Sequence, residues 1–382
     1  MPTGEALRFP RMPLTDTRRR MVPRSPERVR DVARARALAL RYGWNAMAYQ
    51  VVNDGIAHWF SADGDAVIGY VKKHGVCIVA GAPICDGHRL DAVLAEWETF
   101  VFSIRCRSCF FGAAGRLFDE LHDKPGYATV VLGAQPVWNP QYWAEIPART
   151  PSLRGQMHRA RNKGVQVSEW TPARASSDPR LRSVLHDWLR TRLLPTMHFL
   201  VEPHTLHDLE GRRLFVAERG DQVVAFINAS PVAARQGWLV EQFVRGRGAP
   251  NGTIELLLDT MMQAVAADGA TYVTMGLVPL RDGTEGMVLP NPAWLGTLLT
   301  LVRIHGRRFY NFEGLESFKS KFRPHSWEPI YAISAERAFT LRTLYAIGAA
   351  FTMQSPITAL AGGLARAVAT EFRRLRAALS RR

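Results

Sequence analysis

An acidic residue and an arginine precede a glycine-rich turn in the segment 240–252. Glu241 and Arg245 lie in an apolar run with the pattern of a strand, and the glycines that follow lead into an amphipathic helix. Glycines allow backbone N–H groups to approach a ligand closely, and the positive end of the next helix favours an anion. The segment therefore predicts a site for phosphate or another anion that includes Asn251 and Gly252. A plain tight turn is the alternative interpretation.

A second candidate lies on the helix predicted over Pro151–Lys163. Its basic side chains Arg154, His158 and Arg161 share one side, and apolar side chains share another. This strip predicts binding of RNA phosphates or of a lipid phosphate. The alternative is a solvated face over an apolar seam.

Paired lysines lie among aromatic residues in the segment 310–331. Lys319 and Lys321 are flanked by Phe318 and Phe322. A partly apolar setting can hold an ammonium close to a phosphate or an ester carbonyl. The same aromatics are also suited to pack the last helix against a sheet.

Histidines and cysteines do not form a pattern of metal ligands. The histidines between residues 186 and 207 lack a ligand pair with a nearby carboxylate, and Cys106 and Cys109 form a lone CxxC pair. No metal is therefore expected, and the four cysteines are interpreted as small core residues in a reducing compartment. No Ser-His-Asp, Walker or paired-carboxylate hydrolase pattern is visible.

Length and charge set the frame for these candidates. The chain has 382 residues, and 49 Lys and Arg against 34 Asp and Glu give a net charge of +15. The length predicts two domains, and the charge favours nucleic acid or an anionic membrane surface as partner. Residues 1–24 have no signal-peptide pattern and predict a disordered basic tail. Residues 334–382 predict a basic helical tail, in which the stretch 343–365 suits an interfacial helix better than a spanning one.

Two α/β units follow each other along the chain. In residues 25–148, a helix capped by Ser25 precedes three short strands, after which helices and strands alternate. Residues 149–333 repeat this order and include predicted helices over Thr253–Ala267 and Pro292–His305. The order predicts an α/β fold of two tandem units with mixed sheets and covering helices, followed by a C-terminal amphipathic helical tail.

Several stretches between residues 30 and 333 resemble, in the same order, the C-terminal synthase domain of the phosphatidylglycerol lysyltransferase family, the multiple peptide resistance factor. They are A-R-A-L-A-L at 35–40, F-S-A-D-G at 60–64, G-A-P at 81–83, the helix segment 153–164, A-P-N-G at 249–252, M-G-L-V-P-L at 275–280, N-F-E-G-L at 311–315 and W-E-P at 327–329. The resemblance implies two GNAT-like units, of which one binds lipid and the other receives the aminoacyl end of a charged tRNA. It implies an aminoacyltransferase with aminoacyl-tRNA as co-substrate and no cofactor.

The resemblance also implies roles for individual residues. Glu241 takes the place of the acidic residue that orients the incoming amino acid, and Arg245 that of the arginine after it. Lys321, in preference to Lys319, takes the place of the lysine near the reacting ester. Because an aminoacyl ester is already activated, alignment with the acceptor and stabilisation of the oxyanion are the enzyme's main tasks.

Two departures from the family pattern carry further expectations. No multi-helix membrane domain precedes the synthase segment, so we expect no flippase activity and a cytoplasmic protein peripheral to the inner membrane face. Lipid access is then expected through peripheral binding or through a separate membrane protein. The family's G-D-P turn is Gly81-Ala82-Pro83 here, and Glu241 replaces an aspartate. Both changes leave the identity of the donor amino acid open.

Two other functions fit the same residues. An acyl-CoA-dependent N-acyltransferase would hold the CoA pyrophosphate in the loop from Arg245 to Ala249, which resembles the R-G-x-G-A loop of GNAT acyltransferases. A noncatalytic membrane- or RNA-binding protein would bind these partners and form no product.

Overall fold

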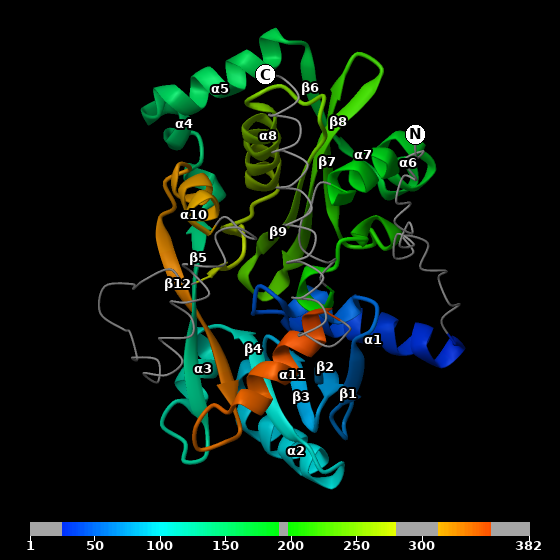
Figure 1. Ribbon diagram of the computed structural model, residues 1–382, viewed down its shortest axis with the longest axis vertical. Helices are drawn as coiled ribbons and strands as arrows, with labels where there is room; N and C mark the ends of the chain where they lie inside the picture. Colours follow the sequence, from blue (N-terminus) through cyan, green and yellow to red (C-terminus); the bar gives the residue numbers. More distant parts are fainter. Residues whose placement is uncertain (1–24, 191–197, 280–311, 353–382) are drawn as a thin grey trace, which may run out of the picture.

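Twelve strands form one mixed sheet in the computed structural model, which describes residues 25–190, 198–279 and 312–352. The strand order is β1-β2-β3-β4-β12-β5-β10-β9-β8-β7-β6, and β11 pairs with β5 outside this path. Helices cover both faces of the sheet, and Figure 1 shows the first unit in its lower half and the second unit in its upper half. The predicted α/β fold with mixed sheets and covering helices is confirmed.

The first unit begins with α1 (Pro26–Tyr42), whose ends agree with the prediction. The Ser25 hydroxyl accepts a hydrogen bond from the Arg28 N–H at its start, and the Gly43 N–H donates to the Ala39 carbonyl at its end. An antiparallel meander follows, and then α2 crosses from β3 to the parallel strand β4. The elements are η1 (Ala48–Val52), β1 (Ala57–Phe60), β2 (Val67–Lys73), β3 (Val76–Ala80), η2 (Gly87–Arg89), α2 (Leu90–Ser103), β4 (Arg107–Ala113), α3 (Gly115–Leu121) and β5 (Ala128–Trp138).

The second unit repeats this plan. Strands β6 to β9 form an antiparallel meander, and α8 crosses from β9 to the parallel strand β10. Two meanders, each followed by a parallel pair with a crossover helix, are the tandem arrangement that the element order predicted. The elements are η3 (Pro140–Tyr142), α4 (Glu145–Arg149), α5 (Pro151–Asn162), β6 (Val165–Trp170), α6 (Pro172–Ser177), α7 (Pro179–Arg190), η4 (Phe199–Val201), η5 (Thr205–His207), β7 (Arg213–Arg219), β8 (Gln222–Val232), η6 (Ala233–Arg235), β9 (Gly237–Arg245), α8 (Thr253–Ala267), β10 (Tyr272–Thr274), β11 (Val278–Pro279), α10 (Phe312–Ser320), β12 (Ser326–Ser334) and α11 (Leu341–Thr352).

Strand β12 ties the two units together. It comes from the segment assigned to the second unit, yet it pairs antiparallel with both β4 and β5 of the first. Strand β5 in turn pairs with β10 of the second unit. Figure 1 shows β5 and β12 running side by side along both halves of the molecule. The sheet is thus continuous across the two units. The division of the chain into two domains between residues 148 and 149 stays a prediction.

The second unit has a separate core on each face of its strands. Phe215 and Ile227 point toward α8 and α10, in a core that also contains Phe322. Phe226 and Val244 point to the other face and pack with α7. Alternate residues of a strand point to opposite faces, so these cores show to which side each polar residue of the strands belongs.

Some elements differ from the sequence prediction. Strand β6 and helix α6 were not predicted, and the predicted helix over Pro292–His305 lies outside the described residues, as do residues 1–24. Of the stretch expected to form an interfacial helix, the described part belongs to α11, which packs on β2 and β3 with Ala346 and Ala350 buried. Within the described residues, no helix has the length and apolarity to span a bilayer.

Candidate functional site

Glu241 lies at a β-bulge in β9. Asn228 of β8 is opposite Gln242 and Ala229 is opposite Val240, so Glu241 has no residue opposite it in the ladder. A bulge of this kind locally changes the direction of a side chain and recurs next to active sites. Here it directs the Glu241 carboxylate to the Asn228 amide, which donates to Oε2 at 3.1 Å.

Glu241 is held in a buried ion pair. The Arg212 Nε donates to both carboxylate oxygens, at 3.3 and 3.1 Å, and the Gln50 amide donates to Oε1. The side chains of Glu241 and Arg212 are only 6% and 1% exposed. Because burial of a charge is costly without a partner, the cluster depends on both members of the pair.

The remaining bonds of this cluster connect the two units. Arg212 also donates to Asn53 Oδ1 at 3.0 Å and to the Asp208 carbonyl at 2.7 Å, and its guanidinium lies 5.2 Å from the centre of the Tyr49 ring. Asn53 donates in turn to Gln50 Oε1 at 2.7 Å. Tyr49 and Gln50 belong to η1 of the first unit and Asn53 follows its end, far from β9 in sequence. Sequence reasoning did not find these partners, because no local pattern marks them.

The loop between β9 and α8 brings three predicted residues together. Arg245 donates to Asn251 Oδ1 and to the Ala249 carbonyl, both at 3.0 Å. Gly252 then starts α8 with a φ of +94°, and a Cβ there would lie 1.8 Å from the Gln156 carbonyl oxygen of α5. Only glycine fits this position, and the predicted start of the helix at Thr253 is confirmed.

Lys321 lies beside the first turn of α8. Its ammonium pairs with Glu255, and it is 4.4 and 4.9 Å from the ring centres of Phe318 and Phe322. Phe318 packs against Phe243 in the core on the α8 face of the sheet. Lys321 thus lies close to the loop that holds Asn251 and Gly252.

Glu241 and Lys321 lie on opposite faces of the sheet. The partner of Glu241, Asn228, is two residues from Phe226, which packs on the α7 face. Arg212 lies on this face too, two residues from Leu214. The structure therefore groups Lys321 with the loop and Glu241 with Arg212.

Lys319 has three backbone partners. Its buried ammonium donates to the carbonyls of Met275, Gly276 and Leu277 at 2.7, 2.8 and 3.1 Å. Burial lowers the pKa of Lys319 to about 7. The three carbonyls favour the protonated form, because only the protonated amine has three N–H donors, one for each carbonyl. In this arrangement Lys319 fixes the turn after β10.

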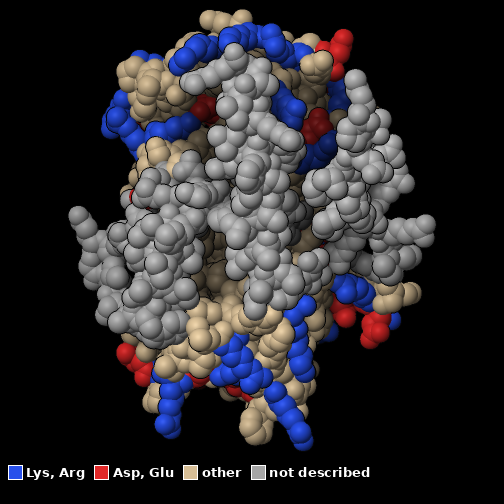
Figure 2. All heavy atoms as spheres, in the orientation of Figure 1, with Lys and Arg blue, Asp and Glu red and all other residues tan. Residues whose placement is uncertain are grey.

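The basic strip of α5 lies on the surface. Arg154, His158 and Arg161 are exposed, and Leu153, Met157 and Ala160 are buried. Arg154 donates to the carbonyls of Pro147 and Ala148, while Arg161 pairs with Asp259 at 3.3 Å. Figure 2 shows Lys and Arg side chains along the upper edge of the molecule, where α5 lies. The predicted amphipathic helix is confirmed.

A second polar cluster joins the units at β12. Arg235 pairs with Glu328 at 2.6 Å, and Gln135 and Tyr272 also donate to this carboxylate, at 3.0 and 3.3 Å. Burial raises the pKa of Glu328, but the Arg235 guanidinium together with the hydrogen bonds from Gln135 and Tyr272 outweighs this effect and holds the pKa below its usual range. Glu328 belongs to the W-E-P motif at 327–329, but the motif alone predicted no role for it.

The sequence profile described as "Phosphatidylglycerol lysyltransferase, C-terminal" matches residues 36–334, which include both polar clusters, the loop and α5. The chain belongs to this family. The phosphatidylglycerol lysyltransferase of Bacillus subtilis is 25% identical over 313 residues, which are 79% of this chain and 35% of that protein. The lysylphosphatidylglycerol biosynthesis bifunctional protein LysX of Mycolicibacterium gilvum is 23% identical over 309 residues, 79% of this chain and 28% of LysX. The chain thus spans about a third of the length of these relatives.

Two solved structures have the same fold. The C-terminal domain of a protein assigned as a lysylphosphatidylglycerol synthetase from Agrobacterium fabrum superposes with a TM-score of 0.72 at 20% identity, covering 85% of this chain and 98% of that one. L-PGS from Bacillus licheniformis gives a TM-score of 0.67 at 20% identity, covering 87% and 95%. Both the family and the tandem fold that the sequence resemblance implied are therefore confirmed.

Proposed function

We propose that the chain transfers an aminoacyl group from aminoacyl-tRNA to the headgroup of a phosphatidylglycerol-type lipid at the cytoplasmic face of the membrane. The match of residues 36–334 to the phosphatidylglycerol lysyltransferase C-terminal family carries the proposal. The buried acidic site at the Glu241 bulge and the basic surface of α5 support it, because they offer one place for an ammonium and another for RNA.

The reaction requires little covalent chemistry from the protein. A headgroup hydroxyl attacks the carbonyl carbon of the aminoacyl ester, and the bond from that carbon to the terminal ribose oxygen breaks. The proton of the hydroxyl passes to the ribose oxygen. Alignment of the two reactants and stabilisation of the oxyanion supply the rate enhancement.

The proposal assigns Glu241 to the α-amine of the donor. Both oxygens of its carboxylate already accept hydrogen bonds from Arg212, Gln50 and Asn228. An incoming ammonium would replace the Gln50 amide at Oε1, since this is a neutral donor and Arg212 is charged. Arg212 would then hold the carboxylate in place and ionised.

The loop and α10 are assigned to the other charges of the reaction. Arg245, Lys321 and the amides at the start of α8 neutralise a phosphate of the tRNA or of the lipid, because they lie on the face opposite Glu241 and the oxyanion forms one carbon away from the α-amine. Asn251 and Gly252 shape the loop. Lys319 fixes the adjacent turn. Arg154, His158 and Arg161 contact the tRNA or a headgroup phosphate through the exposed side of α5.

Lipid reaches the protein by peripheral binding to the inner membrane face or through a separate membrane protein. The net charge of +15 favours an anionic surface. No cofactor takes part, because the aminoacyl ester carries the activation.

The proposal is tested by incubating the chain with phosphatidylglycerol liposomes and a pool of radiolabelled aminoacyl-tRNAs, and then separating the lipids by chromatography. A labelled, amine-bearing lipid is expected, and the label identifies the amino acid. A parallel reaction contains labelled acyl-CoA in place of tRNA. Product from acyl-CoA alone would establish the N-acyltransferase alternative, and liposome or tRNA binding without any product would establish the noncatalytic one.

A further inference from the structure

A cavity opens in the first unit where the parallel strands β3 and β4 end. Its walls come from the end of α1, the loop after β3 and the start of α3. The inner cavity is narrow, with a volume of about 20 Å³, and it opens into an adjoining hollow of about 280 Å³ that faces solvent. The crevice at the carboxyl ends of parallel strands is a common place for ligands in α/β sheets.

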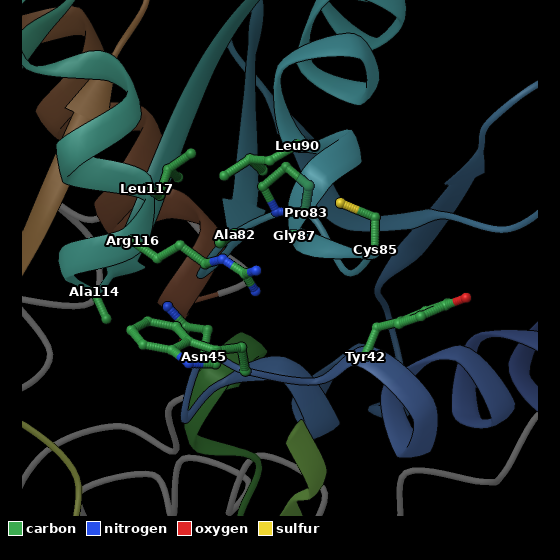
Figure 3. Close-up of a pocket in the computed structure, with 11 residues that line it drawn as sticks. Tyr42, Asn45, Ala82, Pro83, Cys85, Gly87, Leu90, Ala114, Arg116 and Leu117 are labelled. Carbon is green, nitrogen blue, oxygen red and sulfur yellow. The ribbon is translucent and has the colours of Figure 1, made fainter. Parts of the chain in front are cut away.

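Arg116 of α3 points into this cavity (Figure 3). Nearby arginines have carboxylate partners, since Arg41 pairs with Asp65 and Arg89 pairs with Asp63. For Arg116, no hydrogen bond or ion pair with another described residue is found; its guanidinium lies 5.7 Å from the centre of the Trp44 ring. A cation in this position has its hydrogen-bond donors available to a ligand.

Gly87 makes room for this guanidinium. A Cβ built at Gly87 would lie 1.5 Å from Arg116 Nη2. The glycine is needed for the arginine to occupy its place, because a methyl group would displace it. Figure 3 shows Gly87 and Pro83 above the end of the Arg116 side chain.

Apolar and aromatic groups surround the cation. Leu90, Leu117, Ala114 and Pro83 line the inner part of the cavity. Trp44 lines both parts, and its ring also contacts Arg235 of the second unit at 4.9 Å from the ring centre. An apolar setting strengthens the attraction of a guanidinium for an anion, because less water competes for it.

The outer part has a polar lining. Arg41 and His88 line it, together with Asp86, whose Oδ1 accepts a hydrogen bond from the His88 N–H. A ligand therefore meets a polar entrance with charges of both signs, then the Arg116 guanidinium, then an apolar wall. A guanidinium presents paired donors that match two oxygens of a phosphate.

We propose that this cavity is a second ligand site, in which Arg116 binds the phosphate group of a phosphomonoester or phosphodiester. Free glycerophosphate and the headgroup of an anionic phospholipid share this chemistry. The proposal does not depend on the transfer reaction, because the site lies in the first unit and its occupancy can be measured without tRNA. The cavity occupies the place in the first unit that the loop between β9 and α8 occupies in the second, since each follows the first strand of a parallel pair.

Isothermal titration calorimetry of the full chain tests the proposal. The probes are inorganic phosphate, sn-glycerol 3-phosphate, monomeric dihexanoyl phosphatidylglycerol, and glycerate as a carboxylate of similar size. At least one phosphate probe is expected to bind saturably. Arg116→Gln is expected to weaken the binding of this probe about tenfold or more, the range of a lost charge-assisted hydrogen bond. Gly87→Ala is expected to weaken the binding of the same probe too.

Matched variants control for charge and for helix effects. Arg30→Gln removes an exposed charge from α1 about 18 Å along the helix from Tyr42, and Gly115→Ala adds a Cβ with no heavy atom within 4 Å. Both are expected to bind like the unmodified chain. Preference for dihexanoyl phosphatidylglycerol would identify a lipid headgroup as the ligand, and preference for glycerol 3-phosphate would identify a free phosphate. Unchanged affinity in Arg116→Gln, binding of glycerate as tight as that of glycerol 3-phosphate, or no binding of any phosphate probe at millimolar concentration would overturn the proposal.

Discussion

Glu241 and Arg212 form a buried ion pair whose other hydrogen-bond partners come from both units of the chain. Arg212 Nε lies 3.1 Å from Glu241 Oε2, and Gln50 and Asn53 of the first unit bond to one member each. The pair therefore couples the acidic site of the second unit to the packing of the first. Loss of either charge is expected to affect both stability and transfer.

Replacement of Glu241 alone and replacement of both Glu241 and Arg212 are expected to differ in their effect on stability. Glu241→Leu leaves Arg212 buried without its counter-ion, so the free energy of unfolding is expected to fall by about 3–5 kcal/mol. In the double variant with Arg212→Leu, much of this loss is expected to return, because no uncompensated charge remains. Transfer activity is expected to stay absent in both. Urea unfolding and lipid labelling measure the two effects, and recovery of activity in the double variant would show that the carboxylate has no direct role.

The junction of α8 with α5 depends on glycine at position 252. Gly252→Ala places a Cβ 1.8 Å from the Gln156 carbonyl and strains a residue with a φ of +94°. We expect a loss of more than about 2 kcal/mol in the free energy of unfolding. Gly155→Ala, on α5 with no heavy atom within 4 Å of the new Cβ, is the matched control and is expected to stabilise by about 0.5–1 kcal/mol. Equal unfolding midpoints for the two variants would contradict this geometry.

Substitutions of Lys321 and Lys319 are predicted to have different effects on activity and stability. Lys321 is 30% exposed and pairs with the largely buried Glu255, so Lys321→Ala is expected to keep the fold with some loss of stability and to abolish lipid labelling. Lys319→Met leaves three carbonyls without their donor, and each costs about 1–3 kcal/mol when buried. We therefore expect a larger fall in melting temperature for Lys319→Met than for Lys321→Ala. Turnover in Lys321→Ala like that of the unmodified chain would refute its assignment.

RNA binding through α5 predicts a specific salt dependence. Each phosphate contact contributes about 0.7–0.9 to the slope of log affinity against log salt. Arg154→Gln is therefore expected to weaken tRNA binding and to reduce this slope by about one, whereas Arg30→Gln on α1 is expected to leave both unchanged. Binding at several salt concentrations measures the slopes. Identical slopes for the two variants would place the RNA elsewhere.

Local signals predicted the elements well where capping residues mark them. The Ser25 cap defines α1, and the glycine turn ending at Gly252 defines the start of α8, because these ends depend on residues close in sequence. The family and the tandem fold also followed from the order of short motifs. Strand β6 was missed although Val165 and Val167 alternate with polar residues, because only six residues carry the pattern.

The same local signals could not predict the tertiary features of the site. The insertion of β12 between β4 and β5 is a pairing between distant segments. The bulge at Glu241 appears only in the register of β8 and β9. Glu241 was named from the sequence, but its partners Arg212 and Gln50 lie 29 and 191 residues away. The opposite orientation of Glu241 and Lys321 follows from the bulge and has no trace in the residue pattern.

The most direct measurement compares Glu241→Gln with the unmodified chain in the transfer of label from aminoacyl-tRNA to phosphatidylglycerol liposomes. Glutamine keeps the size of the side chain, removes its charge and replaces one acceptor oxygen by an amide donor. The unmodified chain is expected to label the lipid, and to form no labelled lipid when the tRNA is deacylated beforehand. Glu241→Gln is expected to label the lipid at least a hundredfold more slowly. This factor corresponds to a loss of about 2.7 kcal/mol of transition-state stabilisation. Equal rates for the two proteins, or no labelled lipid with any aminoacyl-tRNA, would contradict the account.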